Sequence, residues 1–273
     1  MTIKKEPLVS VIVPCYNQGK YIFEALESVQ RQTFPNFECI IINDGSTDDS
    51  LEIAQKFCRN DSRFICYDKK NEGVSIARNY GISHSHGIYI LPLDADDKID
   101  PKYLDEALSV FRSNPEVKLV YSNTRLFGKI NADFDLPPYD YNRLIHRNHI
   151  VCTALFRRCD FDKTNGYNPN MREGLEDWDF WLSFLQPSDV VYKIDKFLFL
   201  YRKKSKSRNI DARANLRKLR YQIWQNHRDV YAQNFLDPSL SEEYRLLEES
   251  REYRLGKVIL TPIRKLLKLF ESK

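Results

Sequence analysis

Four short apolar runs alternate with helical patterns through the first part of the chain, and this alternation restricts the possible folds severely. The runs read as strands at 9–14, 37–43, 64–67 and 88–93, with helical repeats of apolar residues between them. Parallel strands require crossovers of about a dozen residues, and right-handed crossovers bring helices onto both faces of the sheet. We therefore predict an α/β fold with a mostly parallel sheet flanked by helices.

Polar residues follow the ends of these predicted strands. Tyr16 follows the first strand, Asp44 ends the second, and the carboxylates Asp94, Asp96 and Asp97 follow the fourth. Ligands of open parallel sheets bind outside the carboxyl ends of the strands, so these side chains should line one crevice. Clustered carboxylates repel one another unless a cation lies beside them. The pattern predicts a nucleotide site with Mg²⁺ or Mn²⁺. Taken alone, Tyr16 could simply cover a sheet edge, Asp44 could belong to an ordinary turn, and the three carboxylates could form an acidic helix-capping turn.

Four motifs then resemble, in order and spacing, those of family 2 glycosyltransferases with the Rossmann-like GT-A fold. They are Val-Ser-Val-Ile-Val-Pro-Cys-Tyr-Asn (9–17), Asn-Asp-Gly-Ser-Thr-Asp (43–48), Asn-Glu-Gly-Val-Ser-Ile-Ala-Arg-Asn (71–79) and Asp-Ala-Asp-Asp (94–97). The resemblance covers residues 8–208. It implies a bacterial-type, inverting enzyme of polysaccharide biosynthesis. Such an enzyme transfers a sugar from a nucleotide-sugar donor, which we expect to be a UDP-sugar, to a hydroxyl of a glycan or lipid-linked acceptor.

For the donor, the resemblance implies that Pro14 and Tyr16 line the base pocket and that Asp44 bonds a uracil-type ring. Arg78 would stand near the nucleotide, with a salt bridge on a helix surface as the alternative. Asp94 and Asp96 would be the acidic pair of the fourth motif.

For the metal, the resemblance implies that Asp96 is the ligand of Mn²⁺ or Mg²⁺, with Asp97 as an alternative ligand. Relatives commonly carry Arg-x-His near the end of the matched region, whereas this chain has Arg202-Lys-Lys204. A charged lysine cannot ligate a metal, but it can bind phosphate. We expect Arg202 or Lys204 to close over the diphosphate, and the alternative is a solvated basic loop.

For catalysis, the resemblance assigns an acidic pair that precedes an aromatic helix. Asp177 would be the general base that takes a proton from the acceptor hydroxyl, and Glu176 would contact or position the acceptor. One base opposite the leaving group implies a single displacement with inversion. Stabilisation of the helix dipole explains Glu176 and Asp179 equally well.

The predicted organisation is one GT-A domain followed by an extension. The domain spans 1–208, with a nucleotide-binding half (1–115) and an acceptor or catalytic half (116–208), and 209–273 form a C-terminal helical extension. Thr261 and Pro262 are expected to start a short helix. Its apolar side would carry Ile263, Leu266, Leu267 and Phe270, opposite Arg264, Lys265 and Lys268. Such a helix can contact an anionic membrane through 257–270, or else pack on the body or a dimer partner.

Composition narrows the class of protein. No run approaches the roughly 18 apolar residues of a membrane span, and no signal-peptide core is apparent, so we expect a cytoplasmic protein, with the inner face of the cell membrane as a second expected location. The net charge of +4 combines basic segments at 202–220 and 251–273 with an acidic remainder, which favours an anionic small molecule or lipid over nucleic acid. The functional alternatives are a nucleotidyltransferase and a non-catalytic nucleotide- or glycan-binding module.

Overall fold

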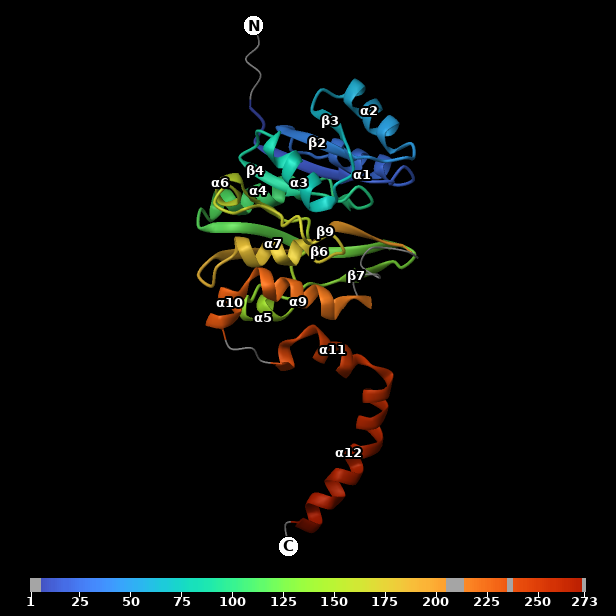
Figure 1. The fold of residues 1–273 in the computed structure, drawn as a ribbon, viewed down its shortest axis with the longest axis vertical. Coiled ribbons are helices and arrows are strands. Elements are labelled where there is room, and N and C mark those ends of the chain that lie inside the picture. Colours follow the sequence, from blue (N-terminus) through green and yellow to red (C-terminus); the bar gives the residue numbers. More distant parts are fainter. Residues whose placement is uncertain (1–5, 205–213, 235–237, 272–273) are drawn as a thin grey trace.

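A mixed β-sheet runs through the body of the molecule, and helices cover both of its faces (Figure 1). The structure is a computed structural model that describes residues 6–204, 214–234 and 238–271, with the side chains of 240, 242, 243 and 264–271 excepted. The predicted α/β class is confirmed.

The first half of the sheet is parallel. Its four strands are β1 (Val9–Cys15), β2 (Phe37–Asp44), β3 (Phe64–Lys69) and β4 (Tyr89–Pro92). The helices that connect them are α1 (Ile22–Gln30), α2 (Ser50–Asn60) and α3 (Val74–Ser83). Strand β1 lies between β2 and β4, and β3 pairs with β2. The carboxyl ends of β1, β2 and β4 therefore share one edge, as the strand and helix pattern predicted.

The second half of the sheet mixes directions. Its strands are β5 (Lys98–Ile99), β6 (Val117–Gly128), β7 (Ala132–Phe134), β8 (Leu155–Arg157) and β9 (Val190–Lys203). Strand β8 is antiparallel to both β4 and β6, and β6 is parallel to β9. The order across the described sheet is β3-β2-β1-β4-β8-β6-β9-β5, with β7 beside β6. The short strand β8 thus joins the parallel half of the sheet to the second half.

Alternate residues of the strands supply two core layers. Val9, Val11 and Val13 of β1 are buried in a cluster with α1, α2 and α4 (Tyr103–Ser113), whereas Ile12 faces the opposite cluster with α3 and α7 (Glu176–Phe184). Side chains alternate between the two faces of a strand, so a continuous apolar run can be buried on both sides. Helix α7, which carries the predicted catalytic pair, is therefore anchored in the second layer.

Part of the predicted extension packs against the body. Helices α9 (Leu216–Asn226) and α10 (Arg228–Gln233) lie beside α7 and α5 (Tyr141–His146) (Figure 1). Leu219 and Ile223 of α9 are 1% and 0% exposed and belong to the core cluster that contains α7. A short helix, α6 (Arg158–Phe161), follows β8.

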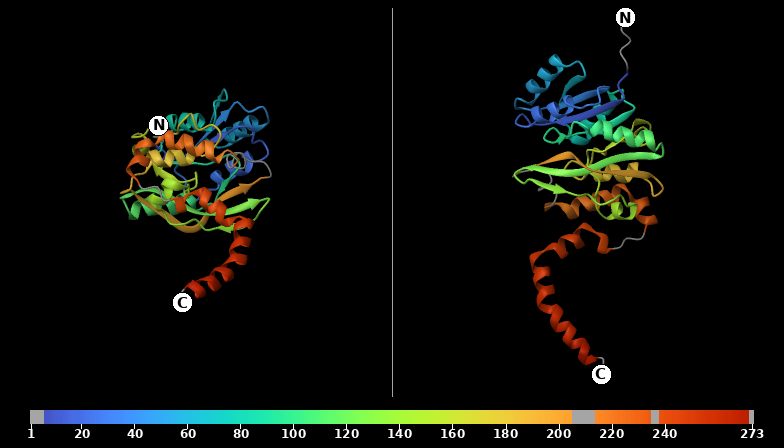
Figure 2. Two further views of the ribbon diagram at one scale, coloured as in Figure 1. Left: turned by 60° about the horizontal axis from the view of Figure 1, so that its bottom comes forward. Right: turned by 180° about the vertical axis from the view of Figure 1, so that it is seen from behind.

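The last helices leave the body. A 3-10 turn, η1 (Pro238–Leu240), and α11 (Glu242–Glu249) lead into α12 (Arg251–Glu271), which projects away from the sheet in every view (Figures 1 and 2). The prediction that a helix starts at Thr261 is wrong, because α12 begins at Arg251 and continues through Pro262. Pro262 removes one backbone donor, but the good helix formers Arg264, Lys265, Leu266 and Leu267 follow it and favour continuation of the helix. Among the described helices, none has the length and apolar character that crossing a membrane requires.

Candidate active site

A cleft of about 730 Å³ opens at the shared edge of β1, β2 and β4 and is closed on its far side by α7 and the end of β9. Every predicted site residue lines it except Asp97 and Arg202. The lining members of that set are Pro14, Tyr16, Asp44, Arg78, Asp94, Asp96, Glu176, Asp177 and Lys204. Residues from the start, middle and end of the matched region therefore face one space.

The side of the cleft formed by the ends of β1 and β2 combines an exposed ring with a buried carboxylate. Tyr16 is 48% exposed, whereas Asp44 is 3% exposed. One carboxylate oxygen of Asp44 accepts from Lys69 Nζ at 2.9 Å, and the other accepts from the backbone N–H of Gly73 at 2.8 Å. Gly45, at φ +74°, allows this loop to approach, because a Cβ there would lie 2.8 Å from the backbone nitrogen of Asn71. Asp44 is therefore held rigidly at the end of β2.

The acidic cluster offers a set of oxygen ligands. Asp94, Asp96 and Asp97 each contribute a carboxylate oxygen, and these atoms lie within 4.8 Å of one another. Asp97 is 1% exposed, and its Oδ2 has no hydrogen-bond partner among the described residues. Burial, together with the carboxylates of Asp96 and Asp94, raises the pKa of Asp97 well above its usual value. An orphaned buried oxygen beside two further carboxylates fits a hard divalent cation such as Mn²⁺ or Mg²⁺.

Arg78 joins the two halves of the cleft. Its guanidinium is buried and contacts Glu176 Oε1 at 2.9 Å and Asp94 Oδ1 at 2.5 Å. The same group lies 5.2 Å from the centroid of the Tyr167 ring. The alternative of a salt bridge on a helix surface is therefore wrong. Arg78 neutralises one carboxylate of the acidic cluster and one of the predicted catalytic pair, so both are held in fixed directions.

The two predicted phosphate-binding residues point in different directions. Arg202 turns away from the cleft, because its Nε donates to the backbone oxygen of Asp96 at 2.7 Å and its Nη2 contacts Glu24 at 3.0 Å. We predicted that Arg202 or Lys204 closes over a diphosphate. Of the two, only Lys204 lines the cleft. Its Nζ lies 2.5 Å from Asp96 Oδ2, which also excludes a solvated basic loop at this residue.

Asp177 sits at the start of α7 with both oxygens oriented. Its Oδ1 accepts from the backbone N–H of Trp178 at 2.8 Å, and its Oδ2 accepts from Asn148 Nδ2 at 2.8 Å. Leu175, at φ +60°, makes the tight turn that precedes the helix. Burial first, and then the nearby Glu176 carboxylate, raise the pKa of Asp177 to about 6. A carboxylate with this pKa can exchange a proton near neutral pH.

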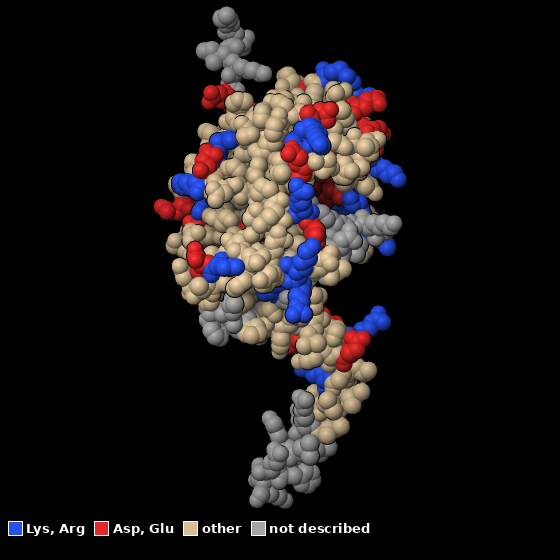
Figure 3. Space-filling model, viewed as in Figure 1, with Lys and Arg blue, Asp and Glu red and all other residues tan. Residues whose placement is uncertain are grey.

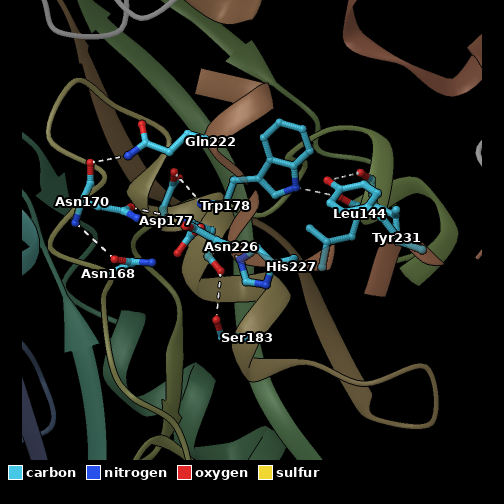
Figure 4. Close-up of polar contacts among 12 residues, drawn as sticks. Leu144, Asn168, Asn170, Asp177, Trp178, Ser183, Gln222, Asn226, His227 and Tyr231 are labelled. Carbon is cyan, nitrogen blue, oxygen red and sulfur yellow. Dashed lines mark hydrogen bonds and ion pairs between the residues drawn. The ribbon is translucent and has the colours of Figure 1, made fainter. Parts of the chain in front are cut away.

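Sequence reasoning missed Asn148, because it lies in a loop whose pattern carries no signal. The contact with Asp177 becomes visible only when α5 and α7 pack together, which they do through a hydrogen bond from Trp178 Nε1 to the backbone oxygen of Leu144 at 2.7 Å (Figure 4).

Helix α9 and the residue between α9 and α10 also contact α7 (Figure 4). Asp179 is 1% exposed, and its Oδ1 contacts Asn226 Nδ2 at 2.6 Å and His227 Nε2 at 3.0 Å. Gln222 donates to the backbone oxygen of Asn170 at 2.7 Å and so holds the loop that leads into α7. Asp179 is therefore more than a helix-dipole group, since it ties α7 to residues that follow the matched region.

Comparison with known proteins agrees with this architecture. Residues 10–206 match the family described as Glycosyl transferase family 2. Among curated proteins, the chain is 32% identical to a chondroitin synthase of Escherichia coli over 187 aligned residues. The aligned region covers 66% of this chain and 27% of that protein. The chain spans about a quarter of the length of the first curated relatives that it matches, 27%, 27% and 26%.

Two solved structures have the same architecture. TarS 1–349 of S. aureus, in complex with UDP-GlcNAc, matches with a TM-score of 0.66 and 21% identity over 92% of this chain and 75% of that chain. The mannosyltransferase PcManGT of Pyrobaculum calidifontis, in complex with GDP-Man and Mn²⁺, matches with a TM-score of 0.61 and 18% identity over 87% of this chain and 67% of that chain. These likenesses confirm the predicted GT-A-like fold.

Proposed function

The chain belongs to glycosyl transferase family 2, and from that premise we propose that it transfers a sugar from a UDP-sugar to a hydroxyl of a glycan or lipid-linked acceptor. The observation that carries the proposal is the convergence of Tyr16 and Asp44, two carboxylates of the acidic cluster (Asp94 and Asp96) and Asp177 on one cleft. A nucleotidyltransferase or a simple binding module would not need Asp177 in that position. The glycosyltransferase assignment therefore takes precedence over both alternatives.

We propose that the donor lies against the carboxyl ends of β1 and β2. The exposed ring of Tyr16 offers a surface on which a base can stack, beside Pro14 at the end of β1. Asp44 would accept from a ring N–H through Oδ2, which accepts one hydrogen bond from the N–H of Gly73, whereas Oδ1 already accepts from Lys69 Nζ and from the N–H of Glu72. With the base held at Tyr16 and Asp44, the sugar of the donor would point toward the acidic cluster and α7.

Asp96 and Asp97 are the proposed ligands of a divalent ion, with Asp94 close by in its ion pair with Arg78. When bound, Mn²⁺ or Mg²⁺ supplies positive charge that stabilises the departing nucleoside diphosphate. Lys204 lies at the same wall of the cleft and adds a further positive charge toward the phosphates. The leaving group needs such charge, since a diphosphate departs with the bonding electron pair.

Asp177 is the proposed general base. It takes the proton of the acceptor hydroxyl while the hydroxyl oxygen attacks the anomeric carbon and the bond from that carbon to the diphosphate oxygen breaks. Asn148 and the N–H of Trp178 hold the carboxylate in one direction. Glu176 is a positioning residue in this proposal, because its carboxylate is paired with Arg78. A single displacement of this kind inverts the anomeric centre.

Calorimetry with UDP tests the donor and metal assignments. We expect Mn²⁺ to tighten UDP binding by about tenfold or more in the wild type, and Asp96→Asn to remove that gain while the metal-free affinity persists. Asp195→Asn, on the exposed surface of β9, is the matched control and should retain the gain. UDP binding that is equal with and without Mn²⁺ and unaffected by Asp96→Asn would contradict the metal site.

A separate screen, the hydrolysis of a panel of UDP- and GDP-sugars by the protein, identifies the donor.

We further propose that α12 contacts an anionic membrane surface, as residues 257–270 suggested. Five apolar side chains of α12 are exposed by between 44% and 72%, and they are Leu255, Val258, Ile259, Leu260 and Ile263. Figure 3 supports this, since uncharged surface of α12 remains exposed on the face in view. Between 251 and 271 the sequence has six Lys or Arg and only two Glu, which disfavours pairing of this helix with a second copy and favours anionic lipid.

Co-sedimentation with vesicles measures this contact. We expect the full chain to bind phosphatidylglycerol-containing vesicles and not purely zwitterionic ones, and the Val258→Ser, Ile259→Ser double variant to bind about tenfold more weakly. The melting temperature of the body should not change, because both side chains are exposed. A variant that sediments like the wild type, or a wild type that forms dimers and ignores vesicles, would contradict the proposal. The location at the inner face of the cell membrane stays a prediction.

A further inference from the structure

Lys204 occupies an unusual position for a basic residue beside a candidate metal site. Its Nζ lies 2.5 Å from Asp96 Oδ2 and 3.3 Å from Gln18 Oε1, and 5.0 Å from the centroid of the Tyr21 ring. The side chains of Lys204 and Asp96 are 17% and 20% exposed, so water screens this ion pair only in part. The ammonium group therefore acts as a counter-ion to the acidic cluster.

The backbone near Lys204 is fixed, whereas its side chain can move. Two residues earlier, the N–H of Arg202 donates to Asp97 Oδ1 at 2.7 Å and its Nε donates to the backbone oxygen of Asp96 at 2.7 Å. These contacts hold the end of β9 against the acidic cluster. Lysine has a flexible four-carbon stem with a compact charge, so its ammonium can exchange one anionic partner for another nearby.

We propose that the Lys204 ammonium and a divalent ion compete for Asp96, and that a nucleoside diphosphate resolves the competition. This inference rests on the proposed function. An ammonium and a metal that share one carboxylate repel each other, so Lys204 lowers the affinity of the cluster for metal alone. When a diphosphate arrives, its oxygens offer the ammonium a second partner, and Asp96 becomes available to the ion.

The consequence is synergistic binding of metal and nucleotide. Each ligand favours the arrangement in which Lys204 has left Asp96, so each should tighten the binding of the other by the same factor. The protein would then hold little metal until a donor is present, and the charge needed at the leaving group would assemble together with the substrate. Lys204 is a positioning and regulatory residue in this account, because its effect on the metal acts through Asp96.

Binding measurements on intact protein test the competition without any assay of transfer. Mn²⁺ alone, UDP alone and the two together are titrated by calorimetry, with electron paramagnetic resonance of free Mn²⁺ as a second readout. We expect Lys204→Met to bind Mn²⁺ alone at least tenfold more tightly than the wild type, to bind UDP alone more weakly, and to reduce the mutual tightening of the two ligands. Lys204→Arg, which keeps the charge, should bind Mn²⁺ alone as weakly as the wild type.

Lys56→Met is the matched control, because it removes an exposed lysine from α2 far from the cleft lining and should leave all three titrations unchanged. Thermal melting verifies that each variant is folded. If the wild type binds UDP and Mn²⁺ together but Lys204→Met binds Mn²⁺ alone no more tightly, the competition is refuted and the proposed function survives. If the wild type binds neither UDP nor Mn²⁺ with UDP, both proposals are refuted.

Discussion

Asp177→Asn is expected to lower the rate of sugar transfer by about 10³-fold while UDP affinity stays within about twofold of the wild type. The amide has nearly the same shape as the carboxylate and can still accept one of the two hydrogen bonds that orient Asp177, from Asn148 or from the N–H of Trp178. It cannot take a proton from an acceptor hydroxyl. The loss should therefore appear in turnover and not in donor binding.

Steady-state kinetics with the identified donor and calorimetry with UDP together measure this difference. Asp229→Asn is a suitable control, since Asp229 also lies in the first turn of a helix, is exposed, and does not line the cleft. Turnover of Asp177→Asn at the wild-type level would remove Asp177 as the base. A parallel loss of UDP binding would instead indicate that the substitution disturbed the cleft as a whole.

The dependence of kcat/KM on pH tests the role of Asp177 independently of the substitution. Burial and the Glu176 carboxylate raise the pKa of Asp177 from an ordinary value of 3.8 to about 6. A base works only when deprotonated, so kcat/KM should fall as the pH drops below about 6, with a slope of about one decade per pH unit. A profile that stays flat down to pH 5 would contradict this assignment.

Arg78→Met is expected to destabilise the folded protein by about 3 kcal/mol, because it leaves two carboxylates without their shared cation. Glu176 is 5% exposed at its side chain and cannot recover full hydration, whereas Asp94, at 30%, can do so in part. We therefore expect the lower end of the range for a broken buried ion pair. The methionine side chain fills much of the vacated volume, so the effect should be mainly electrostatic.

Urea unfolding, followed by fluorescence of the tryptophans, measures the change in free energy. Arg59→Met, at an exposed site in the last turn of α2, should change stability by less than about 0.5 kcal/mol. Adding Glu176→Gln to Arg78→Met should restore part of the lost stability, because it removes one of the two carboxylate charges that Arg78 contacts in the wild type. If Arg78→Met is as stable as the Arg59 control, the guanidinium is not the link between the two halves of the cleft.

Local pattern was enough to predict the parallel half of the sheet. The spacing of apolar residues distinguishes strands from helices over a few residues, and strand ends that share an edge bring Tyr16, Asp44 and the acidic cluster together. The resemblance to a family then pointed to Asp177, and the departure from the family pattern drew attention to Lys204; both residues line the cleft. For Tyr16, Asp44 and the acidic cluster, position along the chain determines position in the fold, because the periods of strand and helix are local properties.

Packing between distant segments decided the remaining features. Arg78 meets Glu176 across 98 residues of sequence, and Lys204 meets Gln18 across 186. Arg202 is directed away from the cleft by Glu24 and the backbone of Asp96. No local period encodes such contacts, because the direction of a side chain depends on which partners the folded sheet and its helices bring within reach.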